Sequence, residues 1–245
     1  MHLIRLLALA ALALPAYSQT LQNGNMWLMY NGDHPIAKSK WGVHLEGHLR
    51  RSDLGLKWQQ LLLRSAVNYQ LSKNISLSGG YTFLQTHPWS SIPSPASFHE
   101  HRIHEQITYN RKLFKLDFSH RIRMEQRYMG VLGKQADGSY AMTSYRYQNR
   151  ARYQARTQIP LKFGDRKNYL ALSDELWFNF GKNVDRNVFD QNRATISVGR
   201  DVGHQTRVEV GFMEQTLQRR GGQIFEANHT IQFTIISRIP FFNND

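Results

Sequence analysis

The sequence predicts an all-β protein, a single antiparallel up-and-down transmembrane β-barrel of about ten strands, with twelve possible. Two observations carry this prediction. Apolar and polar residues alternate along successive segments, each of roughly the length that a tilted strand needs to cross a bilayer. In addition, short turns alternate with longer connections between these segments, as in outer-membrane barrels.

The first part of the chain differs from the rest. Arg5 supplies a positive charge, residues 6–14 are uninterruptedly apolar, and Pro15 ends that run ahead of Ala16-Tyr17-Ser18. This pattern predicts a secretory signal peptide over residues 1–18, removed by cleavage after Ser18. We therefore expect an exported protein whose residues 19–245 form one barrel domain in the outer membrane of the cell.

Composition limits the chemistry and the partners. Cysteine is absent, which excludes a disulfide framework, thiolate metal sites and cysteine catalysis. Lys and Arg number 31 against 18 for Asp and Glu, a net charge of +13 that suits an anionic neighbour. Export argues against nucleic acid, so the expected partners are outer-membrane lipid and lipopolysaccharide, with small anionic solutes as a further candidate.

The alternation is clearest between residues 40 and 50. Trp41, Val43, Leu45 and Leu49 alternate there with His44, Glu46, His48 and Arg50. Four other segments repeat the pattern and five show it more weakly. Together the predicted strands are 40–50, 60–71, 75–83, 101–110, 114–128, 145–159, 168–180, 189–199, 206–217 and 225–236. Residues 26–30 are left open, as either an additional strand or a segment that hooks under the barrel.

The connections predict which end of the barrel is which. Residues 72–74 and 111–113 are tight turns, whereas 86–100 and 129–144 are long. Short turns are expected on the periplasmic side and longer loops outside the cell. Ten strands would place both termini of the chain on the short-turn, periplasmic side.

The apolar face is expected to point outward. Trp41 and Tyr69 lie near the short-turn side and Tyr128 and Tyr145 near the long-loop side, as two interfacial aromatic girdles would require. The polar face then lines the interior. Three acids, Glu105, Asp174 and Glu214, fall on the apolar face and are expected at bulges or strand ends. A soluble periplasmic barrel with an apolar ligand cavity is the alternative.

Arginines dominate the predicted interior. One hypothesis is a narrow anion-preferring channel, with Arg121, Arg123, Arg150 and Arg152 at the constriction and Glu125 and Glu175 as their partners. The other is a structural plug of arginine–carboxylate pairs, which a barrel of this size favours. The candidate residues are Arg102, Arg121, Arg123, Glu125, Arg127, Arg146, Arg150, Arg152, Glu175 and Arg193.

No catalytic, cofactor or metal site is assigned. His101 and His104 could hold a metal with Glu100, but strand parity puts the two histidines on opposite faces. Ser119 and His120 are separated in the same way. A lipid-modifying acyl hydrolase is retained as an alternative, since contacts between strands are invisible in the sequence.

Several short runs also resemble a known family. They are Glu100, Arg102, Glu105 and Gln106; Arg121, Arg123, Glu125, Gln126 and Arg127; Arg150 and Arg152; Asp174, Glu175 and Asn179; and residues 189–193. In order and spacing the chain resembles the Gram-negative outer-membrane proteins grouped as domain of unknown function 2490, from Trp27 to about Phe233. That resemblance implies a β-barrel and supplies no activity, cofactor or catalytic residue.

Overall fold

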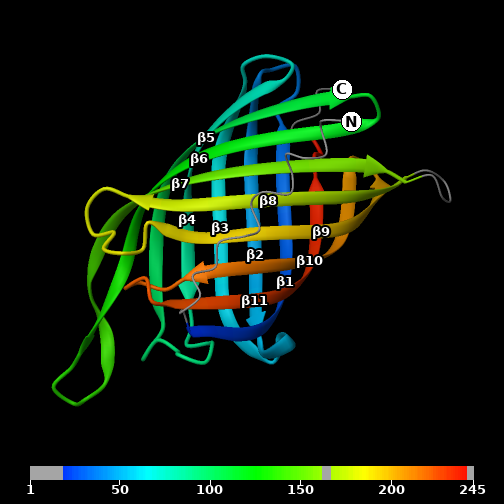
Figure 1. Ribbon diagram of the computed structural model, residues 1–245. Coiled ribbons are helices and arrows are strands. Elements are labelled where there is room, and N and C mark those ends of the chain that lie inside the picture. The colour runs from blue at the N-terminus through cyan, green and yellow to red at the C-terminus, as the bar shows by residue number, and fades with distance from the viewer. Residues whose placement is uncertain (1–18, 162–166, 242–245) are drawn as a thin grey trace.

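A computed structural model describes residues 19–161 and 167–241 and contains a closed barrel of eleven strands (Figure 1). The predicted signal peptide, residues 1–18, lies outside the described residues. No helix in the described part is long and apolar enough to cross a membrane. The strands are β1 (Gln19–Pro35), β2 (Trp41–Ser52), β3 (Lys57–Gln70), β4 (Ile75–Thr86), β5 (Phe98–Leu113), β6 (Leu116–Lys134), β7 (Tyr140–Pro160), β8 (Asn168–Phe180), β9 (Phe189–Gly203), β10 (Thr206–Gln218) and β11 (Ile224–Ser237).

The predicted all-β barrel is confirmed, and its closure adds a feature that the sequence did not predict. Each strand pairs antiparallel with its neighbour in sequence, but β1 pairs parallel with β11, with Leu28 opposite Phe233. An odd number of up-and-down strands makes the first and last run in the same direction, so a wholly antiparallel closure is impossible. Residues 26–30 therefore belong to a full wall strand, β1.

The odd strand count also corrects the expected position of the first strand's beginning. The connections that follow β1, β3, β5, β7 and β9 begin and end at one end of the barrel, here called the turn end. Connections 53–56, 87–97, 135–139, 181–188 and 219–223 lie at the other, the loop end. The last strand finishes at the turn end, as predicted. However, β1 starts beside Ile224, so its first residue lies at the loop end.

The predicted long loop at residues 129–144 is instead mostly a hairpin. The ladder between β6 and β7 continues to Lys134 opposite Tyr140, beyond the last pair with β5, at Met129. The hairpin consequently projects past the rim of the barrel, as Figure 1 shows in green. At its tip the Asp137 carboxylate accepts hydrogen bonds from the hydroxyl and amide of Ser139, which lower its pKa.

The outer wall of the barrel is apolar and the inner wall is polar. Val210, Ile196 and Phe233 point outward and are 54%, 49% and 40% exposed, whereas Arg123 and Arg150 point inward and are 2% and 1% exposed. This distribution reverses that of a soluble barrel, whose apolar side chains fill the interior. It follows directly from the period-two alternation, because successive side chains of a strand point to opposite faces.

The three acids on the apolar face occupy regular ladder positions, which rules out bulges, one of the two expected locations. Glu105, Asp174 and Glu214 lie opposite Met124, Ala155 and Ala194 with no register shift there. Each accepts a hydrogen bond on the outer surface from a polar neighbour: Gln126 at 3.2 Å, Asn192 at 2.6 Å and His229 at 2.6 Å, respectively. The outer wall therefore carries isolated polar pairs within its apolar surface.

Candidate functional site: a charged partition inside the barrel

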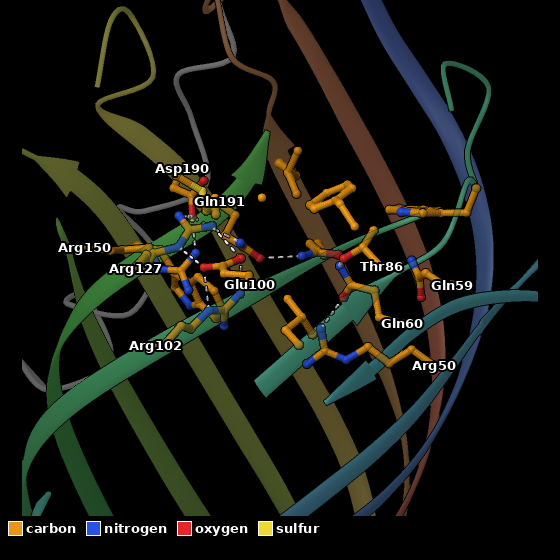
Figure 2. Close-up of a pocket in the computed structure, with 18 of the residues that line it drawn as sticks. Arg50, Gln59, Gln60, Thr86, Glu100, Arg102, Arg127, Arg150, Asp190 and Gln191 are labelled. Carbon is orange, nitrogen blue, oxygen red and sulfur yellow. Dashed lines mark hydrogen bonds and ion pairs between the residues drawn. The ribbon is translucent and has the colours of Figure 1, made fainter. Parts of the chain in front are cut away.

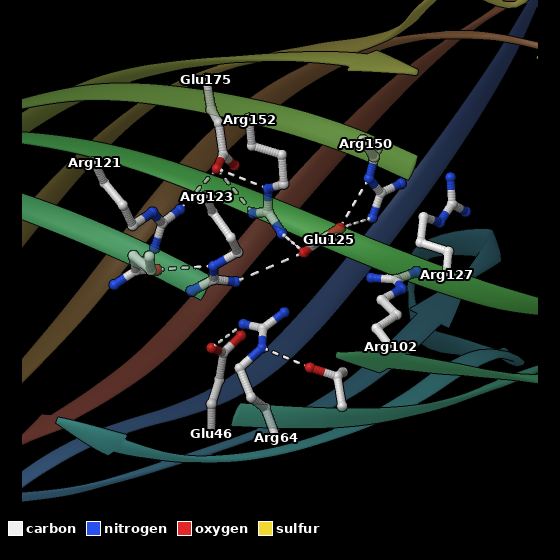
Figure 3. Close-up of polar contacts among 12 residues, drawn as sticks. Glu46, Arg64, Arg102, Arg121, Arg123, Glu125, Arg127, Arg150, Arg152 and Glu175 are labelled. Atoms are coloured by element: carbon white, nitrogen blue, oxygen red, sulfur yellow. Dashed lines mark hydrogen bonds and ion pairs between the residues drawn. The ribbon is translucent and has the colours of Figure 1, made fainter. Parts of the chain in front are cut away.

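Five neighbouring strands, β5 to β9, place a continuous chain of ion pairs inside the barrel. Figure 3 shows its part from Arg121 to Arg150, and Figure 2 shows its part around Glu100 and Asp190. Arginines and carboxylates alternate along it. We call it the arginine–carboxylate chain, and in order of contact its members are Arg121, Glu175, Arg152, Glu125, Arg150, Asp190, Arg127, Glu100 and Arg102. The register brings these residues together, since the members contributed by β5, β6 and β7 are spaced by two or four residues and therefore share the inward face.

Glu125 is the centre of this chain. It accepts from Nε of Arg150 at 2.9 Å and from a terminal nitrogen of Arg152 at 2.7 Å. Arg123 lies at 3.9 Å on the same strand and donates to Gln106 at 2.8 Å. Glu125 is 2% exposed, so the carboxylate depends on these cations in place of water.

Glu175 extends the chain toward the turn end. It accepts from Nε and a terminal nitrogen of Arg152 at 3.1 and 2.8 Å, and from Arg121 at 2.7 Å. Arg152 thus bridges the carboxylates of Glu125 and Glu175. This is a use to which the planar guanidinium fork is well suited and a lysine is not.

Glu100 and Asp190 extend the chain toward the loop end. Arg102 donates to both oxygens of Glu100 at 2.7 and 3.0 Å, and Arg127 donates to them at 2.5 and 3.3 Å. Asp190 accepts from Arg150 at 2.8 Å and lies 4.0 Å from Arg127. Each of these acids therefore lies within 4.0 Å of two arginines.

Indole rings continue the barrier across the barrel. The guanidinium carbons of Arg152, Arg193 and Arg150 lie 3.7, 4.1 and 4.2 Å from the centroid of the Trp177 ring. Arg193 also lies 5.2 Å from the Trp27 ring of β1, on which Arg50 stacks at 4.0 Å. Trp27 is fixed by its Nε1 donating to Gln59 at 2.8 Å. Cation–π contacts therefore connect β8 with β1 across the interior of the barrel, through Arg193.

Two cavities flank this barrier. The loop-end cavity has a volume of about 260 Å³ and is bordered by Arg50, Glu100, Arg127 and Arg146 among others (Figure 2). The turn-end cavity measures about 300 Å³ and is bordered by residues that include His44, Glu46 and Ser197. Trp27 and Arg193 border both cavities and therefore form part of the partition between them.

The structure brings most of the residues predicted from the sequence into one group. Arg102, Arg121, Glu125, Arg127, Arg150, Arg152 and Glu175 belong to the arginine–carboxylate chain, and Arg123 lies beside it. Two of the predicted residues differ. Arg193 donates to Gln191 at 2.9 Å and stacks on tryptophans, and Arg146 lies 3.8 Å from the sulfur of Met129. Neither makes an ion pair with any described residue.

Sequence reasoning missed Asp190 and the two tryptophans. Strand parity places Asp190 on the outer face, but the register shifts between Trp177 and Phe178, so that Gln191 pairs with Trp177 and Phe189 with Phe178. The β-bulge turns Asp190 inward toward Arg150. Trp27 and Trp177 lie two residues from the inward residues Asn25 and Glu175. Strand parity could therefore have assigned both tryptophans to the interior.

The histidine and serine candidates weighed from the sequence lie apart in the described ranges. No group of three or more His, Asp or Glu residues there could hold a metal ion, and His101 lies on the outer wall while His104 is buried inside. His120 binds the Tyr153 hydroxyl at 2.9 Å, away from Ser119. Ser197 donates to Glu209, and the exposed pair His87 and Ser97, 3.1 Å apart, has no carboxylate on the histidine among the described residues.

Comparison with known proteins yields one match. A family model described as "Protein of unknown function (DUF2490)" covers residues 24–226, from the beginning of β1 to the beginning of β11. A search of curated proteins found no match, and a search of solved structures found none either.

Proposed function

This chain belongs to the DUF2490 family, and from that premise we propose that it is an outer-membrane β-barrel whose interior is closed by the arginine–carboxylate chain and its tryptophan stack. In this role the protein is a stable transmembrane scaffold that does not conduct solutes at rest. Its wall contacts lipid, and its loop end faces the cell exterior and lipopolysaccharide. The observation that carries the proposal is the inversion of polarity, with apolar residues outside and ion pairs inside.

A lipid environment accounts for the apolar outer wall. Exposed side chains such as Leu63, Val67, Val198 and Phe212 would be costly in water when gathered over most of the strands. In a bilayer the same surface lowers the free energy of the folded protein. Aromatic residues near the ends of the wall, including Trp41 packed on Tyr69 with ring centroids 4.7 Å apart, suit the interfacial layer.

The closed interior supports a scaffold over an open pore. An open anion channel needs arginines whose charges face water. Here Arg121, Arg150 and Arg152 are bound to carboxylates, and Trp27 and Arg193 separate the two cavities. The polar interior equally disfavours the alternative of a soluble barrel with an apolar ligand. An acyl hydrolase would need a serine in contact with a histidine that is held by a third group. The described pair of His87 and Ser97 has no carboxylate on the histidine among the described residues.

Cell fractionation and single-channel recording would test the proposal. We expect the protein in the detergent-extracted outer membrane and, after reconstitution into a planar bilayer, no discrete current steps. A variant with Trp27→Ala and Arg193→Ala should conduct, because it removes the two side chains that border both cavities.

The control for the recording is Arg111→Ala, which removes one exposed arginine at the turn end and should leave the bilayer silent. Anion-selective steps from the unmodified protein would contradict a closed interior. Recovery of the protein from the soluble periplasm without detergent would contradict membrane insertion. The two results are independent of each other.

A further inference from the structure

The loop-end cavity holds more positive charge than the barrel neutralises. Six arginines border it, namely Arg50, Arg102, Arg127, Arg146, Arg150 and Arg193, against two carboxylates, Glu100 and Asp190. The paired arginines are accounted for by the arginine–carboxylate chain. Arg50, Arg146 and Arg193 are not, since none of the three makes an ion pair with any residue that the structure describes.

Two of these arginines, Arg50 and Arg146, keep donors in reserve. Arg50 is 5% exposed, donates to Gln60 at 2.7 Å and lies 3.0 Å from Nδ1 of His48, yet its buried Nε has no hydrogen-bond partner among the described residues. The buried Nε of Arg146 is likewise unpartnered there. A buried charged donor without a partner is costly, so these groups indicate a missing acceptor.

We propose that the loop-end cavity is a binding site for a small phosphorylated anion, held by Arg50, Arg146 and Arg193. A phosphoryl group suits this place because it carries up to two negative charges and three oxygens that accept from several guanidinium groups at once. The cavity of about 260 Å³ has room for such an ion. Glutamines that border the cavity, Gln59, Gln60 and Gln191, add neutral donors.

The loop end also places a natural fluorescent reporter beside the cavity. Trp89, in the connection between β4 and β5, borders the cavity. That connection is held across the rim, because Arg219 donates to Ser90 at 2.7 Å while its Nε donates to Glu226 at 2.7 Å. An anion bound in the cavity would therefore lie near Trp89, and also near Trp27 and Trp177 on the cavity border, and should change the tryptophan fluorescence.

The test is a titration of the detergent-folded full-length protein with inorganic pyrophosphate, followed by tryptophan fluorescence and calorimetry. We expect saturable binding that weakens with added salt. Arg50→Gln and Arg146→Gln should each weaken binding about tenfold or more. Arg50→Lys keeps the charge and should retain part of the affinity, and Arg111→Gln, a matched loss of an exposed arginine outside the cavity, should bind as the unmodified protein does.

A second arm identifies the source of the phosphoryl group. Phosphatidylcholine vesicles with and without phosphatidic acid present the same group on a lipid. A response to pyrophosphate assigns the site to a soluble phosphorylated anion, which we expect from its position inside the barrel. A response to phosphatidic acid alone, lost in Arg146→Gln, assigns it to a lipid headgroup.

Two results would overturn the proposal. One is the absence of any response to both probes from protein that is folded by circular dichroism. The other is binding that Arg50→Gln and Arg146→Gln leave unchanged. Arg146→Gln is the safer of the two variants, because the guanidinium makes one hydrogen-bond contact with the described side chains, to the Met129 sulfur. The titration needs no bilayer, so its failure is distinguishable from failure of the proposed membrane role.

Discussion

The guanidinium carbon of Arg152 lies 3.7 Å from the centre of the Trp177 ring, while its nitrogens donate in their own plane to Glu125 and Glu175. One buried cation is thereby satisfied at its edge by carboxylates and on its face by an indole. This combination lets an arginine replace water inside a narrow barrel. It also makes the carboxylates, which hold two arginines each, the sensitive points of the interior.

Replacing the central carboxylate should destabilise the barrel strongly. Glu125→Gln leaves Arg150 and Arg152 with one negative neighbour fewer while nearly preserving the volume of the side chain. We expect a loss of about 3 kcal/mol in the free energy of unfolding, at the low end for a broken buried pair, because each arginine keeps a second carboxylate. Urea-induced unfolding in lipid vesicles, followed by tryptophan fluorescence, measures it.

The matched control is Glu105→Gln on the outer wall, whose side chain is exposed and accepts one hydrogen bond, from Gln126. We expect that change to lower stability by less than about 1 kcal/mol. Equal losses for the two variants would show that the interior ion pairs do not hold the barrel together.

A lysine introduced on the outer wall should report the position of the bilayer. Val198 and Val202 both face outward on β9, at 52% and 50% exposed. Val198 lies five residues from Gly203, where β9 ends at the turn end. With a strand tilt of about 45°, this separation corresponds to a height of about 12 Å above the turn end. Val198 therefore lies near the middle of an apolar band about 25 Å tall. Val198→Lys should cost about 2–4 kcal/mol and Val202→Lys at most about 1 kcal/mol, measured by reversible folding into vesicles. Equal costs would contradict a bilayer around this wall.

The inner residues could be predicted from sequence where the ladder is regular. From Arg121 to Arg127 the pairing of β6 with β7 has no register shift, so period two alone assigns each side chain to a face. The same rule failed at Asp190, because one extra residue at a bulge reverses the parity locally. The sequence pattern contains no signal for that extra residue.

Contacts between strands were beyond the sequence for a different reason. Glu125 and Arg150 are far apart in the chain, and only the register between β6 and β7 brings them together. The closing strand β1 was underestimated because Asn23, Gly24, Asn25 and Gly32 interrupt its alternation. Its place depends on pairing with both β2 and β11, including a hydrogen bond that the Asn23 side-chain amide donates to the Asn228 amide oxygen at 2.9 Å.

A glycine on the inner wall should prove sensitive to one added methyl group. A Cβ at Gly199 would lie 2.3–2.6 Å from atoms of the Tyr169 ring, whose hydroxyl donates to Glu209 at 2.8 Å. Gly199→Ala must therefore displace the ring, and we expect a loss of about 1–3 kcal/mol in stability. Gly79→Ala is the control, since its nearest contact would be 4.0 Å away, at the His104 carbonyl oxygen. Thermal unfolding of both variants in detergent compares them, and an unaffected Gly199→Ala would mean that Tyr169 packs elsewhere.

The parallel closure can be tested with a disulfide, because the natural chain contains no cysteine. Leu28 of β1 lies opposite Phe233 of β11, so Leu28→Cys with Phe233→Cys places two thiols on adjacent strands, about 5 Å apart between Cα atoms. We expect this pair to oxidise readily and to raise the temperature of unfolding. Leu49→Cys with Phe233→Cys is the control, because Leu49 pairs with Leu28 and is therefore one strand further from β11. A barrel closed without β1 would leave Leu28 and Phe233 apart, so the absence of a cross-link between them would contradict the parallel closure.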